Sequence, residues 1–228
     1  MQRYKWLLFD ADGTLFNYNK AEGTALREAF RLIGVEYEPN YLATCRRINE
    51  AAWQALEKGE LTLGLLKVRR FELLLQAVGV AYLPAVLSAT YLDCLAACAE
   101  LEADAAEVLQ ALQGKYRMAI LTNGLTTVQR GRLARSVIGQ YFAEIIISEE
   151  IGAAKPAREF FDVVWKRLGN PGRNDALMIG DGWASDMAGA VAYGLDTCWY
   201  NPGRKPRPDG RKITHEIASL RELIGWLG

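Results

Sequence analysis

The sequence predicts an α/β protein, with a helix-flanked parallel β-sheet and a helical module inserted near the amino terminus. An apolar run at residues 6–9 precedes the turn Asp10-Ala11-Asp12-Gly13 and is typical of a strand buried on both faces. From residue 117 onward, short apolar strands alternate with helical stretches, as in parallel sheets. Between them, residues 22–113 show helical periodicity. Together these patterns predict a core that is interrupted by an all-helical insertion.

The individual helices and strands are predicted from the spacing of apolar residues and from the glycines that end helices. Two helices of the module carry apolar stripes, at Leu42, Cys45, Ile48, Ala52 and Leu56 and at Leu65, Val68, Phe71, Leu75 and Val78, with Gly34, Gly59 and Gly79 as stops. Later strands are predicted over 117–121, 145–147, 177–179 and 197–200, and helices over 128–138 and 159–168. The strand over 6–9 has two apolar faces to bury, so we expect it to join the later strands.

Composition favours an enzyme that acts on a small molecule. The 228 residues carry equal numbers of basic and acidic side chains, so no net field attracts nucleic acid or a membrane surface. We see neither the pattern of a signal peptide nor an apolar stretch near the roughly 20 residues that span a bilayer. We therefore expect a cytoplasmic monomer or homodimer with a small-molecule substrate, no nucleic-acid polymer and no membrane partner. The basic, proline-rich segment 203–212 is predicted to be a solvated surface loop.

Cysteine and histidine usage narrows the chemistry. Cys45, Cys94, Cys98 and Cys198 are dispersed without a Cys-x-x-Cys motif, so we expect reduced thiols and no zinc site. The single histidine, His215, lies in a polar segment near the carboxyl terminus. Serine and cysteine mechanisms that need an imidazole base therefore lose support, and carboxylate chemistry remains.

Asp10 and Asp12 are the first candidate catalytic residues. They follow the amino-terminal strand two positions apart, and Gly13 allows the chain to turn away at once. Ligands of parallel sheets bind beyond the carboxyl ends of the strands. An isolated Asp-Gly pair is more often a simple polar turn, so other segments have to decide.

Three later segments supply compatible residues at predicted strand ends or helix starts. Thr122 and Asn123 offer a hydroxyl, an amide and backbone N–H groups suited to holding phosphate. Lys155 precedes a proline that fixes the local chain direction. Asp181 ends another strand, and Asp186 follows five residues later. Each segment alone reads as a turn, a cap or a solvated residue, but the predicted topology brings all three beside Asp10.

The assembled residues indicate magnesium-dependent phosphoryl transfer. Four acids, Asp10, Asp12, Asp181 and Asp186, would repel one another unless a hard divalent cation were present, and Mg²⁺ fits best. An ionised Asp10 could attack phosphorus and form an aspartyl phosphate. Asp12 could protonate the leaving alcohol and then deprotonate the hydrolytic water. Lys155 would add positive charge beside the phosphate.

These four segments, in order, resemble the motifs of the haloacid dehalogenase-like hydrolase superfamily. The resemblance spans nearly the whole chain and implies a Rossmann-like three-layer core over residues 1–16 and 99–228, with a helical cap over 17–98. It implies that Asp10 is the nucleophile, Asp12 the acid and base, and that Thr122, Asn123 and Lys155 bind phosphate. It also implies that Asp10, the Asp12 carbonyl and Asp181 ligate Mg²⁺, with Asp186 acting from behind them.

Finer features point to a substrate class. The segments 121–125, 148–156 and 197–201 resemble those of bacterial pyrimidine 5′-nucleotidases, which implies hydrolysis of nucleoside monophosphates such as dUMP, dTMP or UMP. A sugar-phosphate phosphatase or a phosphomutase similar to β-phosphoglucomutase is the alternative. A 2-haloacid dehalogenase is disfavoured because those enzymes usually lack the acid at the position of Asp12. A non-catalytic phosphate sensor is disfavoured because Asp12 and Lys155 are both present.

Two departures from the family pattern concern the acidic loop and the return from the cap. Gly182 stands where many relatives have a hydroxyl or an acid, which leaves open how the acidic loop is positioned. Residues 102–104 replace a proline-containing return. Six cap side chains could contact a base or sugar but could equally be packing or surface residues, namely Asn17, Tyr18, Arg46, Trp53, Arg69 and Phe71.

Overall fold

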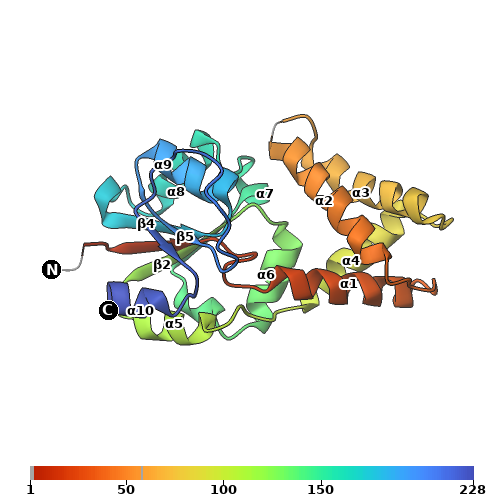
Figure 1. The fold of residues 1–228 in the computed structure, drawn as a ribbon, viewed down its shortest axis with the longest axis horizontal. Helices are drawn as coiled ribbons and strands as arrows, with labels where there is room; N and C mark the ends of the chain where they lie inside the picture. Colours follow the sequence, from red (N-terminus) through yellow and green to blue (C-terminus); the bar gives the residue numbers. More distant parts are fainter. Residues whose placement is uncertain (1–2, 58) are drawn as a thin grey trace.

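The computed structural model describes residues 3–57 and 59–228 and shows an α/β core with a group of helices beside it (Figure 1). The core contains one parallel sheet in the order β3-β2-β1-β4-β5-β6. Its strands are β1 (Trp6–Phe9), β2 (Arg117–Thr122), β3 (Glu144–Ile147), β4 (Ala176–Gly180), β5 (Asp196–Tyr200) and β6 (His215–Ile217). The predicted fold class, a Rossmann-like α/β core with an inserted helical module, is confirmed.

Strand β1 lies at the centre of the sheet although it comes first in the sequence. Leu8 is in register with Ala119 on one neighbouring strand and with Met178 on the other. All four residues of β1 are buried. The predicted pairing of this strand with later ones is therefore correct, and the core is discontinuous in sequence.

Helices cover both faces of the sheet, because alternate strand residues point to opposite sides. Leu7 and Phe9 pack with α5 (Ala105–Leu112) and α10 (Glu222–Leu227). Trp6 and Leu8 pack with α8 (Arg158–Arg167) and α9 (Ala188–Tyr193). This arrangement gives three layers. The sequence patterns missed β6 and α10, which are three and six residues long, and the helix expected over 128–138 is α6 (Thr126–Arg135).

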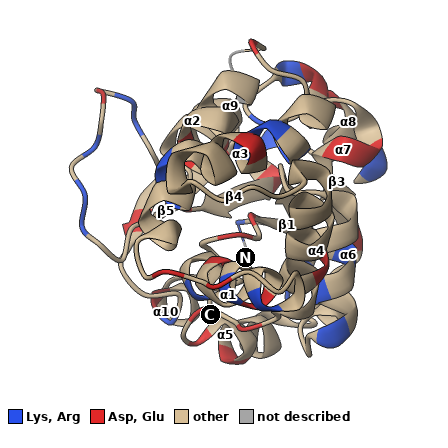
Figure 2. Cartoon of the chain, turned by 90° about the vertical axis from the view of Figure 1, so that its right-hand side faces the viewer, with Lys and Arg blue, Asp and Glu red and all other residues tan. Residues whose placement is uncertain are grey.

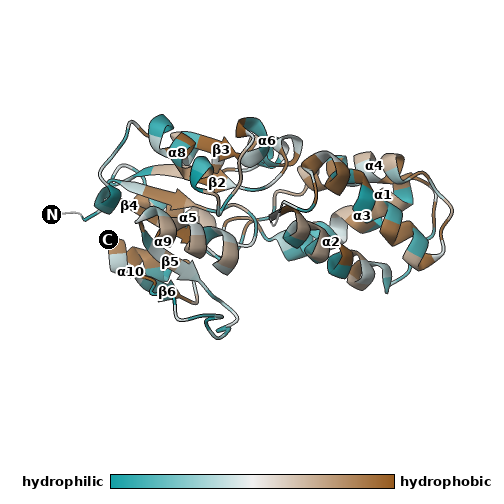
Figure 3. Cartoon of the chain, turned by 90° about the horizontal axis from the view of Figure 1, so that it is seen from above, coloured by the Kyte–Doolittle hydropathy of each residue, from teal (hydrophilic) through white to brown (hydrophobic). Residues whose placement is uncertain are grey.

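The helices α1 (Tyr18–Leu32), α2 (Tyr41–Glu57), α3 (Leu63–Val78) and α4 (Pro84–Ala97) form the second unit, called the cap from here on. The cap extends away from one end of the core (Figure 3) and has an apolar cluster of its own. Leu125, at the N-cap of the core helix α6, and Val128 of that helix join this cluster. The predicted stripe on α3 is partly wrong. Leu65 and Val68 are 60% and 38% exposed, whereas Leu66 and Leu74 are fully buried.

The two connections between core and cap run side by side. The Asn17 amide donates to the Glu100 carbonyl at 3.0 Å, and the Glu102 amide donates to the Leu15 carbonyl at 2.9 Å. In the return segment, Asp104 adopts a left-handed φ of 64°. The cap is thus attached through residues 15–17 and 98–102, called the hinge from here on, and the first of these segments begins only a few residues after Asp12.

Other expectations concern the surface and the thiols. The basic segment 203–212 projects from the core as a loop and is largely exposed, as predicted (Figure 2). The four cysteines are free thiols. Among the helices in the described part of the chain, none combines the length and the apolarity needed to cross a membrane.

Candidate active site

The carboxyl ends of β1, β2 and β4 open into a cavity of about 260 Å³ between core and cap. The sheet register brings Asp10 after β1, Thr122 at the end of β2 and Asp181 after β4 to the same edge. The core side chains and backbone that line the cavity come from Asp10, Asp12, Thr122, Asn123, Gly124, Lys155, Asp181, Gly182, Ser185 and Asp186. All the core residues that the sequence nominated therefore meet in one place.

Lys155 is the buried cation of this cavity and is 2% exposed. Its Nζ lies 2.6 Å from Asp10 Oδ1 and 2.7 Å from Asp186 Oδ1, and it donates to the Leu121 carbonyl at 2.6 Å. Burial opposes the charge, but the two carboxylates outweigh it and raise the pKa of the Lys155 ammonium. The Asn123 amide bonds to both the N–H and the carbonyl of Lys155, each at 2.8 Å. Asn123 thus orients the lysine, and its side-chain oxygen and nitrogen are both engaged in doing so.

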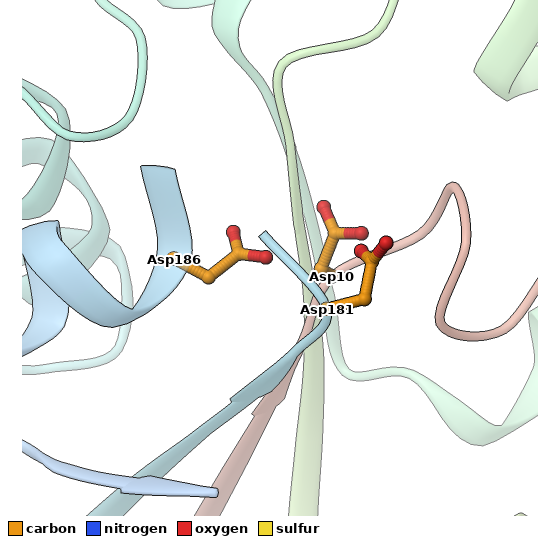
Figure 4. Close-up of side chains that lie close together, drawn as sticks. All are labelled: Asp10, Asp181 and Asp186. Atoms are coloured by element: carbon orange, nitrogen blue, oxygen red, sulfur yellow. The ribbon is translucent and has the colours of Figure 1, made fainter. Parts of the chain in front are cut away.

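Three carboxylates face one another at the cavity floor, from Asp10, Asp181 and Asp186 (Figure 4). One oxygen of each lies within 4.8 Å of the others. Burial and the two neighbouring acids raise the pKa of Asp10 well above its usual range, against the opposing effect of Lys155. The Asp181 side chain opens to the cavity, yet surrounding protein atoms and the Asp186 carboxylate raise its pKa to about 7. One lysine does not balance three acids, so the donor set fits a hard divalent cation.

The acidic loop after β4 is held tightly, which resolves the question raised by Gly182. The Gly182 amide donates to Asp186 Oδ2 at 3.0 Å, and a Cβ at Gly182 would lie 2.8 Å from that oxygen. Residues Trp183–Met187 form a π-helical turn, a feature that often occurs at functional sites. The Trp199 indole donates to the Asp181 carbonyl at 3.0 Å. Glycine at position 182 therefore permits the close approach that fixes Asp186.

Gly13 and Thr14 join the first motif to the acidic loop. Gly13 has a φ of 84°, and a Cβ there would lie 2.6 Å from Asp181 Oδ2. Thr14 is fully buried, and its hydroxyl accepts from the Asp181 amide at 3.1 Å. The turn that follows Asp12 is thus shaped to receive Asp181, a role that the sequence did not reveal for Thr14.

Asp12 points to side chains that the sequence analysis did not nominate. Its Oδ2 accepts from Gln129 Nε2 at 2.5 Å, and its Oδ1 pairs with the Arg132 guanidinium. The Asp12 carboxylate consequently lies outside the cluster of three acids. Gln129 and Arg132 lie three residues apart on one face of α6, which begins four residues after Thr122. Two polar side chains on one face of a helix that begins so close to Thr122 were the sequence signal that could have identified these partners of Asp12.

On the cap side, Tyr18, Asn49 and Trp53 line the cavity. The sequence analysis did not nominate Asn49. The Asn49 side-chain nitrogen donates to the Tyr18 hydroxyl at 3.0 Å, and Arg70 donates to Asn49 Oδ1 at 2.6 Å. The other nominated cap residues lie elsewhere. Asn17 caps α1, Arg46 pairs with Glu22, Arg69 pairs with Glu72, and Phe71 is buried in the cap cluster.

Comparison with known proteins agrees with this geometry. A family model described as haloacid dehalogenase-like hydrolase matches residues 4–194. The chain belongs to this hydrolase family. It is 33% identical to pyrimidine 5′-nucleotidase YjjG of Escherichia coli, over 97% of this chain and 96% of that protein. It is 32% identical to pyrimidine 5′-nucleotidase PynA of Streptococcus pneumoniae, over 98% and 95% of the two chains. The magnesium-bound structure of the HAD-hydrolase YfnB from Bacillus subtilis superposes with a TM-score of 0.93 at 34% identity, with both chains fully covered.

As a haloacid dehalogenase-like hydrolase, the chain is an enzyme, as the sequence predicted. The matched region contains β1 to β4 and all four nominated segments. The chain's histidine, His215, lies on β6 with its ring 4.1 Å from that of Trp226 and does not line the cavity. Among the described core residues that line the cavity, the side chains available for chemistry are the carboxylates, Lys155 and the hydroxyls of Thr122 and Ser185.

Proposed function

We propose that this hydrolase is a magnesium-dependent phosphatase of nucleoside 5′-monophosphates, with pyrimidine nucleotides as the preferred class. The observation that carries the proposal is the Asp10–Lys155 pair, 2.6 Å apart, beside the Asp181 and Asp186 carboxylates at one sheet edge. This arrangement provides an oxygen nucleophile, a fixed cation and a ligand set for a dication within one cavity. The preference for nucleotides rests on the similarity to YjjG and PynA, which are pyrimidine 5′-nucleotidases.

Magnesium is the cofactor that these residues would hold. Asp10 and Asp181 supply carboxylate oxygens, and we propose the Asp12 carbonyl as a further ligand, with Asp186 supporting the site through Lys155 and Gly182. When bound, the dication neutralises charge on the phosphate and favours the ionised carboxylates whose pKa values burial otherwise raises. The similarity to YfnB, whose structure contains magnesium, supports this assignment.

Asp10 would act as the nucleophile. Its Oδ1 is held by Lys155, which leaves Oδ2 available for attack on phosphorus. A bond then forms between Oδ2 and phosphorus while the bond from phosphorus to the 5′-oxygen of the nucleoside breaks. Lys155 and the Thr122 hydroxyl would hold the transferring phosphoryl group.

Asp12 would complete the cycle as acid and then as base. Its proton passes to the departing 5′-oxygen, so the nucleoside leaves as a neutral alcohol. The resulting carboxylate removes a proton from the attacking water, the bond from phosphorus to Asp10 breaks, and inorganic phosphate is released. Both carboxylates return to their starting states, so no imidazole is needed.

A substrate panel with a nucleophile variant tests the proposal. With Mg²⁺, we expect phosphate release from pyrimidine 5′-monophosphates at rates well above those for sugar phosphates, and loss of turnover after chelation with EDTA. Asp10→Asn should lower kcat by roughly 10⁴-fold or more because the amide is a poor nucleophile. Asp93→Asn removes an exposed acid on α4 and serves as the matched control.

The covalent intermediate can be observed directly. A rapid acid quench with ³²P-labelled nucleotide should leave label on the wild-type protein that hydroxylamine releases, and no label on Asp10→Asn. Release of phosphate from hexose phosphates but from none of the nucleotides would reject the nucleotide assignment. Turnover in Asp10→Asn near the wild-type rate would reject the mechanism.

A further inference from the structure

Arg132 and Gln129 are two buried polar residues of α6 to which the proposed reaction assigns no task. They are 0% and 1% exposed. Both donate to Asp12, with Gln129 Nε2 on Oδ2 at 2.5 Å and the Arg132 guanidinium on Oδ1. Each oxygen of one carboxylate is therefore held by a different side chain of the same helix.

The Arg132 guanidinium is itself fixed by the hinge. Its Nε donates to the Cys98 carbonyl at 2.8 Å, and its central carbon lies 5.0 Å from the centroid of the Phe16 ring. Phe16 is where the chain leaves the core for the cap, and Cys98 is where the chain leaves α4 on its way back. The guanidinium thus spans Asp12 and both connections of the cap.

Fold stability does not account for this arginine. A buried ion pair is generally no more stabilising than apolar side chains of similar volume, because desolvation offsets the attraction. Here one terminal NH2 group of Arg132 and the Gln129 Oε1 atom are also buried and have no hydrogen-bond partner among the described residues, which adds a cost. A residue needed only for packing at this position would be better served by an apolar side chain.

We propose that Arg132 and Gln129 are positioning residues that hold the acid and base Asp12 in its working orientation. The inference rests on the proposed function, since it assumes that Asp12 transfers the proton. A carboxylate has about four lone-pair sites, and the two donors occupy one on each oxygen. The Asp12 side chain is 27% exposed and lines the cavity, so its remaining sites are open to substrate.

The two donors also constrain where a proton on Asp12 can go. Arg132 has no acceptor atom, and Gln129 presents its Nε2 donor to Asp12. A proton that Asp12 transfers would therefore leave or arrive through the oxygen sites still open to the cavity, where the leaving oxygen and later the water would lie. Because Arg132 also bonds to the hinge, the orientation of the Asp12 carboxylate is set relative to the cap.

The leading test replaces Gln129, the uncharged one of the two donors, in the magnesium-loaded full-length enzyme. Gln129→Met keeps the approximate side-chain length and removes the hydrogen bond. On a nucleoside 5′-monophosphate, whose alkoxide leaves poorly, kcat should fall roughly 10- to 100-fold with KM within about threefold. On 4-nitrophenyl phosphate, whose leaving group needs little protonation, the loss should stay below about threefold. Arg132→Lys should behave in the same way, because it keeps the charge but loses the two-sided geometry.

A double-mutant cycle separates positioning from packing. In the Asp12→Asn background the proton-transferring group is absent, so adding Gln129→Met should lower kcat by no more than about twofold. Arg130→Met is the matched control: this exposed arginine of α6 pairs with Glu150 and faces away from Asp12, so we expect wild-type kinetics. Thermal unfolding identifies any variant whose loss reflects instability.

The outcomes discriminate between the two proposals. Equal losses on alkyl and aryl phosphates, or a full additional loss in the Asp12→Asn background, would overturn the positioning role. Wild-type kinetics of both Gln129→Met and Arg132→Lys would overturn it as well. In all of these cases a leaving-group effect of Asp12→Asn alone leaves the phosphatase mechanism intact, whereas a wild-type enzyme inactive on both substrates would reject the proposed function itself.

Discussion

At the scale of single residues, the sequence predicts polar side chains that follow buried strands better than those carried on helices. Asp10 and Asp181 stand out because each ends an apolar run, and the register of β1 with β4 places them together. Arg132 is fully buried, but an arginine on an amphipathic helix is ordinarily assigned to the solvated face. Its burial depends on the hinge lying across α6, which no local pattern contains.

Gly13 provides a prediction at this scale. Replacement by alanine combines two costs, because φ is 84° and the new Cβ would lie 2.6 Å from Asp181 Oδ2. We expect Gly13→Ala to destabilise the fold by about 1–3 kcal/mol and to displace Asp181 from the acidic cluster. Magnesium titration of activity should show a weaker apparent affinity for the cation. Gly34→Ala has a similar φ of 71° with open space around it, so it should lower stability and leave the magnesium dependence unchanged.

At the scale of elements, periodicity located the helices but not always the faces they bury. On α3 the predicted stripe began at Leu65, whereas the buried residues begin at Leu66, although Phe71 and Leu75 of that stripe are buried as predicted. Short elements such as β6 gave no signal, since three residues cannot show a period. The cap residues at the cavity, Tyr18, Asn49 and Trp53, were correspondingly only partly foreseen.

Helix α2 carries the element-scale prediction, through Trp53. This indole lines the cavity between core and cap and also a neighbouring space of about 330 Å³ bordered by Leu56, Pro156 and Ala157. A nucleobase that occupies this space would lie against an aromatic and largely apolar wall, so Trp53→Ala should reduce kcat/KM for nucleotides by roughly 10-fold. The value for ribose 5-phosphate, which lacks the base, should change by less than about twofold.

A surface variant of the cap controls for nonspecific effects of Trp53→Ala. Leu65→Ala removes an apolar side chain of α3 that is 60% exposed and does not line the cavity, so both substrates should behave as in wild type. A Trp53→Ala loss that is the same for nucleotide and ribose 5-phosphate would argue against contact with the base.

At the scale of the whole molecule, the sequence predicted two units but not how they are joined. The helical insertion and the discontinuous core follow from composition and strand pattern. Their connection depends on α6 and its N-cap: Leu125, at the N-cap, and Val128 belong to the cap cluster, whereas Leu133 belongs to the core cluster. A single helix thus carries apolar residues for both units as well as Gln129 and Arg132. We therefore expect core and cap to unfold together.

Alkaline unfolding tests this cooperativity through buried thiols in the two units. Burial raises the pKa of the Cys45 thiol, in the cap, from its ordinary value of 9.0 to about 12. Burial also raises the pKa of the Cys198 thiol, in β5. The unfolded thiols lose protons first, so stability is complete below about pH 9 and falls as pH rises toward the folded pKa, by up to about 1.4 kcal/mol per unit for each group. Urea unfolding in reductant at several pH values between about 8 and 10 should show this decline, and Cys45→Ala should make it shallower.

The same variant reports whether core and cap unfold together. If they do, Cys45→Ala shifts a single unfolding transition that every spectroscopic probe detects. A change confined to the first of two separate transitions would show that the cap unfolds alone, despite its packing on α6.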